Sequence, residues 1–234
     1  MKNSTEQLMM DGISIQVVRK NIKNINLRVQ GPEGQVSMSV PREVDDQSIK
    51  AFARAKMPWI NKHRSRLAAV KPPPVRQFVT GEAHAFMGQM YELKVVEMNQ
   101  ASAKQGVRQR ENFLELYVKP GHTGEDREAL LYQWYREQLK ALIPPCIQKW
   151  EPVMGVKVHQ WGVKRMKTRW GTCNIQAKRI WINLELARKS PECLEYIVVH
   201  EMVHLLERHH NQRFKGLMDR FLPLWRHLRR ELAG

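Results

Sequence analysis

The chain has 234 residues, of which 42% are apolar, so it can bury a sizeable core as one domain or as a small domain joined to a larger one. Three cysteines without Cys-x-x-Cys spacing exclude a disulfide framework and a cysteine zinc knuckle, and the lack of a signal sequence or an 18-residue apolar run predicts a soluble, cytoplasmic protein. The net charge of +16 allows weak binding to polyanions, but the basic residues are spread out, which favours a solvated basic surface.

The first 75 residues are predicted to form a small sheet followed by a helix. Alternating β-branched residues separated by turn signals predict a three-stranded meander from residues 13–19, 24–30 and 35–40. After these strands, the spacing of the apolar residues becomes that of a helix, capped by Asp45 or Asp46. Pro58 is expected to start a second turn of this helix. The run Lys71-Pro72-Pro73-Pro74 predicts a semi-rigid polyproline connector.

The middle of the chain changes from strands to a helix. Four further segments are strand-like: residues 77–80, 83–87, 91–98 and 112–118. Residues 123–150 begin with acids and continue as an amphipathic helix, which Pro144 and Pro145 are expected to interrupt. Because the chain is mainly β before Gly121 and mainly α after it, we expect a β-rich N-terminal part, residues 1–120, and a helical domain, residues 121–234. No internal repeat is visible.

A strand pair is predicted before the next helix, from residues 156–165 and 178–183, joined through residues 168–174. Gly171 beside Trp170 allows two interpretations: a close approach of backbone next to an aromatic wall, or a tight hairpin turn with a buried tryptophan. Cys173 lies in the same segment and is expected to be a small apolar filler.

The segment His200-Glu201-Met202-Val203-His204 carries the most specific chemical signal in the sequence. It lies in a helix that starts clearly at Ser190-Pro191-Glu192, with an N-cap residue, a proline and an acid in order. On a helix, His200 and His204 share one face and can bind one ion, while Glu201 can reach a water on that ion as general base. Because a bound metal lowers the pKa of water to about 7, the motif predicts hydrolysis.

A catalytic zinc needs a third protein ligand, and His209 and His210 are the two candidates. On a continuous helix, His210 would be turned about 80° from His200 and lie about 9 Å beyond His204, out of reach of the same ion. The helix must therefore end near residues 206–208 and the chain must fold back. Glu207 stands where metzincin proteases have a glycine, which argues against a metzincin.

Two short helices are expected after the motif. Residues 211–222 have helical spacing with Asn211 as N-cap, which would leave His210 just before the helix and free to turn toward the metal. After Pro223, a last helix is predicted with Arg226, Arg229 and Arg230 on its solvated face.

The chain resembles the YgjP-like metal-dependent hydrolases, a zincin-type family related to the SprT-like and M48-type metallopeptidases. The resemblance is carried by residues 166–173, Ile182-Asn183-Leu184, Ser190-Pro191, residues 195–201, His204-Leu205, His210 and Phe214, and extends upstream to residues 17–20, 27–29, 40–41 and 59–60. It implies an α+β fold, with a β-rich N-terminal part before a mainly helical zincin-like domain. It also implies zinc ligands His200, His204 and His210, and thus favours His210 over His209.

Three functions are compatible with these residues. The leading hypothesis is a zinc peptidase, with Zn²⁺ on His200, His204 and His210 and Glu201 as general base. Its oxyanion stabiliser is unassigned, with Arg169 and His159 as candidates. Tyr196 is expected to point elsewhere on the helix. The second is a nucleotide pyrophosphatase, with Arg165, Lys167 and Arg169 on phosphate oxygens, and the family resemblance implies uridine triphosphate as its substrate. The third is a nucleic-acid-associated protein with a structural metal. Cobalt, nickel or iron would also suit three imidazoles, and manganese is another candidate for the second function.

Overall fold

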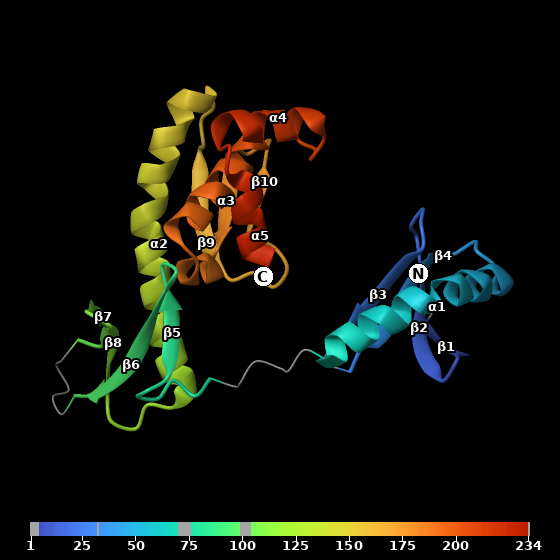
Figure 1. The fold of residues 1–234 in the computed structure, drawn as a ribbon, viewed down its shortest axis with the longest axis horizontal. Coiled ribbons are helices and arrows are strands. Elements are labelled where there is room, and N and C mark those ends of the chain that lie inside the picture. The colour runs from blue at the N-terminus through green and yellow to red at the C-terminus, as the bar shows by residue number, and fades with distance from the viewer. Residues whose placement is uncertain (1–4, 32, 70–75, 99–103, 234) are drawn as a thin grey trace. The chain divides into compact units, whose positions relative to one another are not determined.

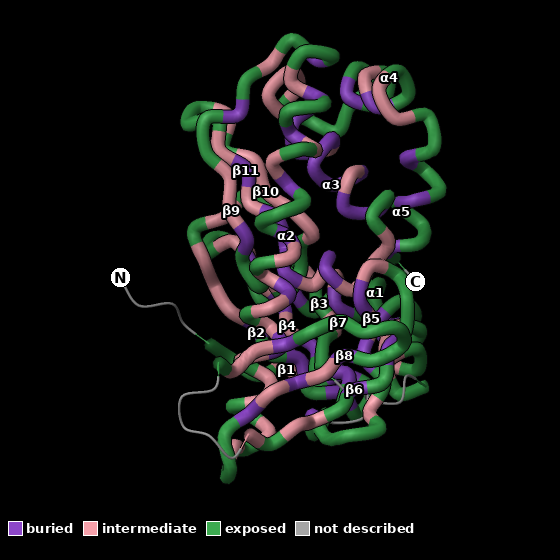
Figure 2. The backbone as a smooth tube through the Cα atoms, turned by 90° about the vertical axis from the view of Figure 1, so that its left-hand side faces the viewer, coloured by how far each residue is buried: buried purple, intermediate pink, exposed green. Residues whose placement is uncertain are grey.

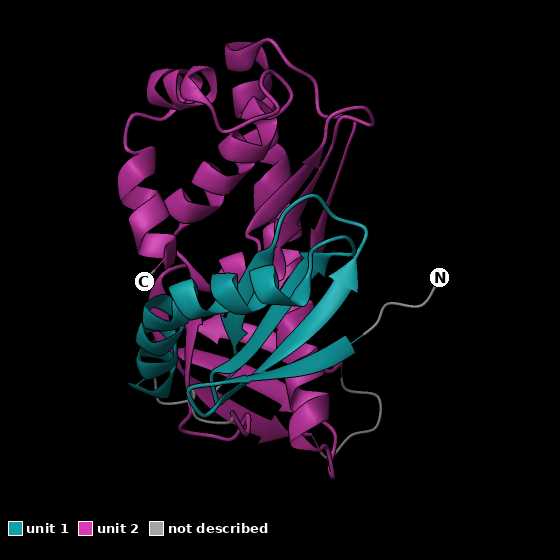
Figure 3. Ribbon diagram, turned by 90° about the vertical axis from the view of Figure 1, so that its right-hand side faces the viewer, with its two compact units in different colours: residues 1–75 teal, residues 76–234 magenta. Residues whose placement is uncertain are grey.

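The structure is a computed structural model that describes residues 5–31, 33–69, 76–98 and 104–233. The chain separates into two compact units, residues 1–75 and 76–234 (Figure 3). The predicted polyproline connector at residues 71–74 lies outside the described residues. Among the described helices, none combines the length and apolar character needed to cross a bilayer.

The first unit is a four-stranded sheet with one helix. Strands β1 (Thr5–Met10), β2 (Ile13–Lys20), β3 (Asn26–Gln30) and β4 (Gln35–Pro41) are arranged in the order β1-β2-β4-β3, followed by helix α1 (Asp46–Ala69). The predicted meander is wrong, because β2 pairs in parallel with β4 and an extra strand, β1, completes the sheet. Alternation identified three strands but did not determine their partners.

Helix α1 covers the sheet with one apolar stripe. Its buried residues are Ile49, Ala53, Met57 and Ile60, which join the buried strand residues in one core cluster. Pro58 lies inside the helix and does not divide it. A proline in a helix interior costs about 3 kcal/mol, so the packing of its neighbours Met57 and Ile60 on the sheet must offset the lost hydrogen bond.

The second unit begins with another sheet of the same topology. Strands β5 (Ala83–Phe86), β6 (Gln89–Glu97), β7 (Gly106–Arg110) and β8 (Phe113–Val118) are arranged in the order β5-β6-β8-β7, again with a parallel central pair and a long helix afterwards. Residues 77–80 are not a strand, and β7 was not predicted. The chain thus contains a repeated four-strand-and-helix arrangement that its sequence does not reveal.

Helix α2 (Gly124–Met154) starts at a capping box between Thr123 and Asp126 and ends at Gly155, whose φ of 65° is left-handed. The predicted interruption at Pro144 and Pro145 is absent, because the helix runs through both prolines (Figure 1). Its buried stripe continues on both sides of them: Leu131, Tyr135, Leu139, Ile143, Ile147, Trp150 and Met154. Packing of this stripe against the rest of the unit holds the helix together.

A three-stranded sheet and the last helices complete the second unit. Strands β9 (Gln160–Lys164), β10 (Gly171–Asn174) and β11 (Arg179–Asn183) lie in the order β10-β11-β9, so the predicted pair lacked β10. The 3₁₀ helix η1 (Leu184–Arg188), α3 (Pro191–Val203), α4 (Gln212–Phe221) and α5 (Trp225–Ala233) follow. Helix α3 is buried along most of its length (Figure 2).

One hydrophobic core joins strands β5–β8 to α2, the β9–β11 sheet and α3. The change from mainly β to mainly α structure after residue 120 therefore falls inside the second unit, since β8 ends at Val118 and α2 begins at Gly124. Composition marks where the type of element changes, whereas shared burial determines which elements form a unit.

Candidate metal centre

Helix α3 places the motif residues at the border between the core and a cleft. The Ser190 side chain accepts a hydrogen bond from the Cys193 backbone N–H, and Pro191 occupies the first turn, as predicted. Most of the residues between Cys193 and Val203 are buried. His200 is half-buried and faces the cleft, so the core fixes the helix while this side chain remains accessible from the cleft.

The chain folds back directly after the motif. Helix α3 ends at Val203, earlier than the predicted 206–208, and residues 204–206 form a turn in which His204 donates its backbone N–H to the His200 carbonyl. No residue from 204 to 210 has a positive φ, so the turn needs no glycine. Asn211 then accepts a hydrogen bond from the Phe214 N–H and starts α4. His210 is thus held between a turn and an N-cap.

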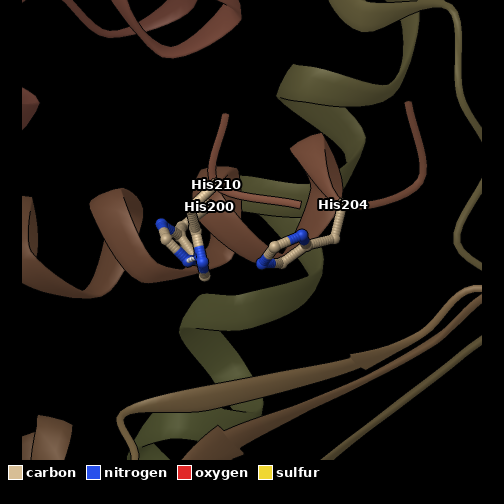
Figure 4. A group of neighbouring side chains, drawn as sticks. All are labelled: His200, His204 and His210. Carbon is tan, nitrogen blue, oxygen red and sulfur yellow. Dashed lines mark hydrogen bonds between the residues drawn. The ribbon is translucent and has the colours of Figure 1, made fainter. Parts of the chain in front are cut away.

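Three imidazoles converge as a result. His200, His204 and His210 offer ring nitrogens that all lie within 4.8 Å of one another, and Nε2 of His200 is 3.0 Å from Nε2 of His210 (Figure 4). Within the described part of the chain they form the one group of three or more histidine, cysteine or acidic residues close enough to share a metal. His209 is exposed, outside this group, and donates its backbone N–H to Glu207.

The buried ring of Phe214 supports all three imidazoles. Its centroid lies 4.9 Å from that of His200, 4.8 Å from His204 and 4.7 Å from His210. The Nδ1 atom of His204 is 3.1 Å from the Glu207 carbonyl oxygen, which can only accept, so Nδ1 donates and Nε2 is left with a free lone pair. An apolar support and a carbonyl behind an imidazole are common around protein-bound metals.

The site favours neutral imidazoles. Burial lowers the pKa of His200 to about 3, with the charges of His204, His210 and Arg229 acting in the same direction. Burial also lowers the pKa values of His204 and His210. A neutral imidazole keeps the lone pair that a metal requires. Three such nitrogens gathered within 4.8 Å of one another form a donor set of the kind that holds one divalent cation.

Glu201 lies beside this cluster against the backbone of β10. Its side chain is 5% exposed, and burial raises its pKa to about 8, opposed by the charge of Arg169. A Cβ atom added to Gly171 would lie 2.5 Å from Glu201 Oε1 and 2.8 Å from its Cγ. The glycine therefore makes room for the Glu201 carboxylate, a side-chain contact that neither interpretation of Gly171 included.

A cleft of about 1540 Å³ connects these features. It is lined by β10 on one side and by α3, the turn after it, α4 and α5 on the others. Strand β10 is the edge of its sheet, so its outer backbone groups have no strand partner within the described residues. An edge strand beside a cleft can bind an extended peptide through main-chain hydrogen bonds.

The other residues considered for the site from the sequence lie partly inside and partly outside the lining of the cleft. Arg169 lines the cleft, whereas His159 is exposed and outside the lining. Tyr196, expected to point elsewhere, lines the cleft and packs edge-on against the His200 ring at 5.8 Å between centroids. Cys173 is half-buried in the cleft wall, where burial raises the pKa of its thiol to about 12.

Two contributors were not recognised from sequence. Asn183, buried at the end of β11, donates its side-chain N–H groups to the carbonyls of Met166 and Arg169, at 2.9 and 2.7 Å, and so fixes the loop before Gly171. Arg229 of α5 is exposed, as predicted, but its solvated face also lines the cleft, where its charge lowers the pKa of His200. The spacing of residues in helix α5 did not by itself predict that this helix borders the cleft.

Three convergent imidazoles with an adjoining carboxylate define the class of metal-dependent hydrolases. The family described as YgjP-like, metallopeptidase domain, matches residues 23–234, and the chain belongs to this family. A comparison with curated proteins found no match.

Two solved structures of metallopeptidase zymogens are similar to parts of this chain. Abylysin of Pyrococcus abyssi is 14% identical, with 38% of this chain and 90% of that one covered at a TM-score of 0.36. Jannalysin of Methanocaldococcus jannaschii is 15% identical, with 41% and 93% covered at a TM-score of 0.34.

Proposed function

We propose that the protein is a zinc-dependent peptidase in which His200, His204 and His210 bind one Zn²⁺ and Glu201 is the general base. The observation that carries the proposal is the convergence of the three imidazoles next to Glu201 in a cleft bordered by the free edge of β10. Cobalt, nickel or iron would also suit three imidazoles, so elemental analysis of protein purified without added metal identifies the ion.

The bound ion supplies Lewis acidity and lowers the pKa of water to about 7. The chain supplies the rest. The edge of β10 holds the substrate backbone extended, and Gly171 in this strand leaves room for the side chain of Glu201. Glu201 accepts a proton as the water oxygen bonds to the peptide carbonyl carbon, and returns it to the amine nitrogen as the carbon–nitrogen bond breaks. Of the two candidates for stabilising the developing oxyanion, Arg169 lines the cleft and His159 does not.

The test is hydrolysis of casein and of fluorogenic peptides by the zinc-loaded protein. Glu201→Gln should lower kcat about 10²- to 10⁴-fold and leave the metal content unchanged, because it removes the base without removing a ligand. His204→Ala should lose the metal, and a chelator should abolish activity until zinc is restored. Glu192→Gln, in the exposed first turn of the same helix, is the matched control and should behave like the wild type. Full activity of Glu201→Gln would contradict the proposal.

A pyrophosphatase acting on uridine triphosphate is the second candidate, favoured by the cationic side chains in the cleft. Of the three residues assigned to phosphate binding from sequence, Arg169 lines the cleft. Arg165 is instead paired with Glu128 and Glu185, and Lys167 is outside the lining. Release of pyrophosphate from the nucleotide without casein cleavage would replace the peptidase by this activity.

Nucleic-acid association with a structural metal stays the third candidate, and the net charge of +16 is its support. It predicts DNA binding that weakens steeply with salt and that Glu201→Gln leaves intact.

A further inference from the structure

The cleft beside the histidine cluster is lined by four cationic side chains from four separate segments. They come from the loop before β10, the turn after α3, helix α4 and helix α5: Arg169, Arg208, Lys215 and Arg229. Within the described residues, none of the four forms an ion pair or a side-chain hydrogen bond with a carboxylate. Their charge is therefore available to a bound molecule.

Acidic groups in the cleft do not balance this charge. The lining contains two carboxylates, Glu201 and Glu207. Glu201 is buried against Gly171, and Glu207 accepts the His209 N–H and lies 3.8 Å from Arg213. Some arginines elsewhere in the unit are paired with carboxylates, as Arg226 is with Asp219 and Arg188 with Glu185. The lining of the cleft therefore carries an excess of positive charge.

Arg229 has the most specific position of the four. Helix α5 is anchored by buried Trp225, Leu228 and Leu232, and the Trp225 ring stacks on Tyr196 of α3 with centroids 6.5 Å apart. This packing places the exposed Arg229 in the lining of the cleft, where its charge lowers the pKa values of both His200 and His210. Arg169 lies on the other side, next to Glu201. Cations therefore flank the reaction centre from two walls.

We propose that the cleft selects peptides that carry aspartate or glutamate next to the bond to be cleaved, with Arg229 as the main specificity residue and Arg169 as the second. This inference rests on the proposed peptidase function. An arginine binds a carboxylate through two parallel, charge-assisted hydrogen bonds, which gives geometry as well as attraction. A glutamine at the same position of the peptide offers one neutral acceptor oxygen, so it loses most of the binding energy that the carboxylate gains from the arginine.

The experiment uses full-length zinc-loaded protein and pairs of fluorogenic peptides. The two peptides of a pair are identical except that one has glutamate and the other glutamine at a single position, and each pair tests one of the two residues on either side of the bond to be cleaved. The wild type should prefer the best glutamate peptide about 10- to 100-fold in kcat/KM, and the preference should weaken with added salt. Arg229→Gln should bring the ratio close to one, and Arg229→Lys should restore part of it. Arg230→Gln, one position later and outside the lining, should keep the wild-type ratio.

Binding separates this inference from the peptidase proposal. Fluorescence anisotropy of the same peptides with Glu201→Gln reports selection without turnover, and metal content shows whether each variant is folded. Tighter binding of the glutamate peptide that depends on Arg229 supports the selectivity even when no peptide is cleaved. Equal cleavage and binding of both peptides by the wild type overturns it, as does a preference that survives both Arg229→Gln and Arg169→Gln, or turnover of uridine triphosphate without peptide discrimination.

Discussion

At the scale of single residues, the site depends on a contact that requires the absence of a side chain. Gly171 lies so close to Glu201 that an added Cβ would be 2.5 Å from its Oε1 atom. Real carbon and oxygen atoms do not approach to this distance, so any other residue at position 171 must displace the carboxylate. The three histidines are separate from this contact, since α3, the turn and Phe214 hold them.

Gly171→Ala should therefore lower kcat/KM about 100-fold while the metal content stays at the wild-type level, because a displacement of about 1 Å at a reacting group has an effect of this size. Gly216→Ala is the matched control, since nothing lies within 4 Å of its added Cβ and alanine stabilises a helix by up to about 1 kcal/mol over glycine. It should retain activity and gain stability. Wild-type kcat/KM in Gly171→Ala would show that Glu201 has room to move.

At the scale of elements, the strand edge along the cleft is kept in place by a loop that one buried side chain organises. Asn183 donates to the carbonyls of Met166 and Arg169, accepts from the backbone N–H groups of Met166 and Glu185, and its own N–H donates to the Trp170 carbonyl at 2.8 Å. It thereby connects β11, η1 and the loop that leads into β10.

Asn183→Ala should destabilise the protein by about 2–4 kcal/mol, since the loss of one buried partner leaves several backbone groups unsatisfied. The same change should lower kcat/KM, because the loop carries Arg169 and leads into Gly171. Asn174→Ala is a control for stability: its side chain accepts one hydrogen bond from the Ala177 N–H at an exposed turn, so less than about 1 kcal/mol is expected. Chemical denaturation of both variants measures the difference, and equal losses would contradict the role of Asn183.

At the scale of the whole molecule, two similar sheet-and-helix arrangements differ in what they bury. The second sheet contains His84, which is fully buried and 3.0 Å through Nδ1 from Arg76 Nη1. Burial, with the charges of Arg76 and Arg188, lowers its pKa to about 4, although Glu82 acts in the opposite direction. In the unfolded chain a histidine has a pKa of about 6.5, so between these values the unfolded state binds the additional proton.

The contribution of neutral His84 to the free energy of unfolding should therefore be fully present above pH 6.5. It should be lost as the pH decreases from 6.5 toward 4. His84→Gln cannot take up this proton, so its free energy of unfolding should fall by about 3 kcal/mol less across that window than the wild-type value. Both free energies of unfolding are measured by urea unfolding of metal-free protein. The pKa values of the cluster histidines are lowered as well, so these groups act in the same direction in both proteins. Parallel pH curves for the two proteins would exclude His84 as a source of acid sensitivity.

Local spacing along the chain was enough to predict part of the site. The pair His200 and His204 follows from the helical period, the start of α3 from Ser190 and Pro191, and the need for the chain to fold back from the reach of a third imidazole. His210 was favoured over His209 because of a family resemblance, and the chain belongs to that family.

Which distant segments meet could not be predicted from the sequence. Strand partners in both sheets, the continuity of α2 through two prolines, the approach of Gly171 to Glu201 and the turn of Arg229 into the cleft all depend on packing between elements. Periodicity assigns a residue to a face of its own element, but the partner of that face is selected by burial summed over the whole core, which no local pattern contains.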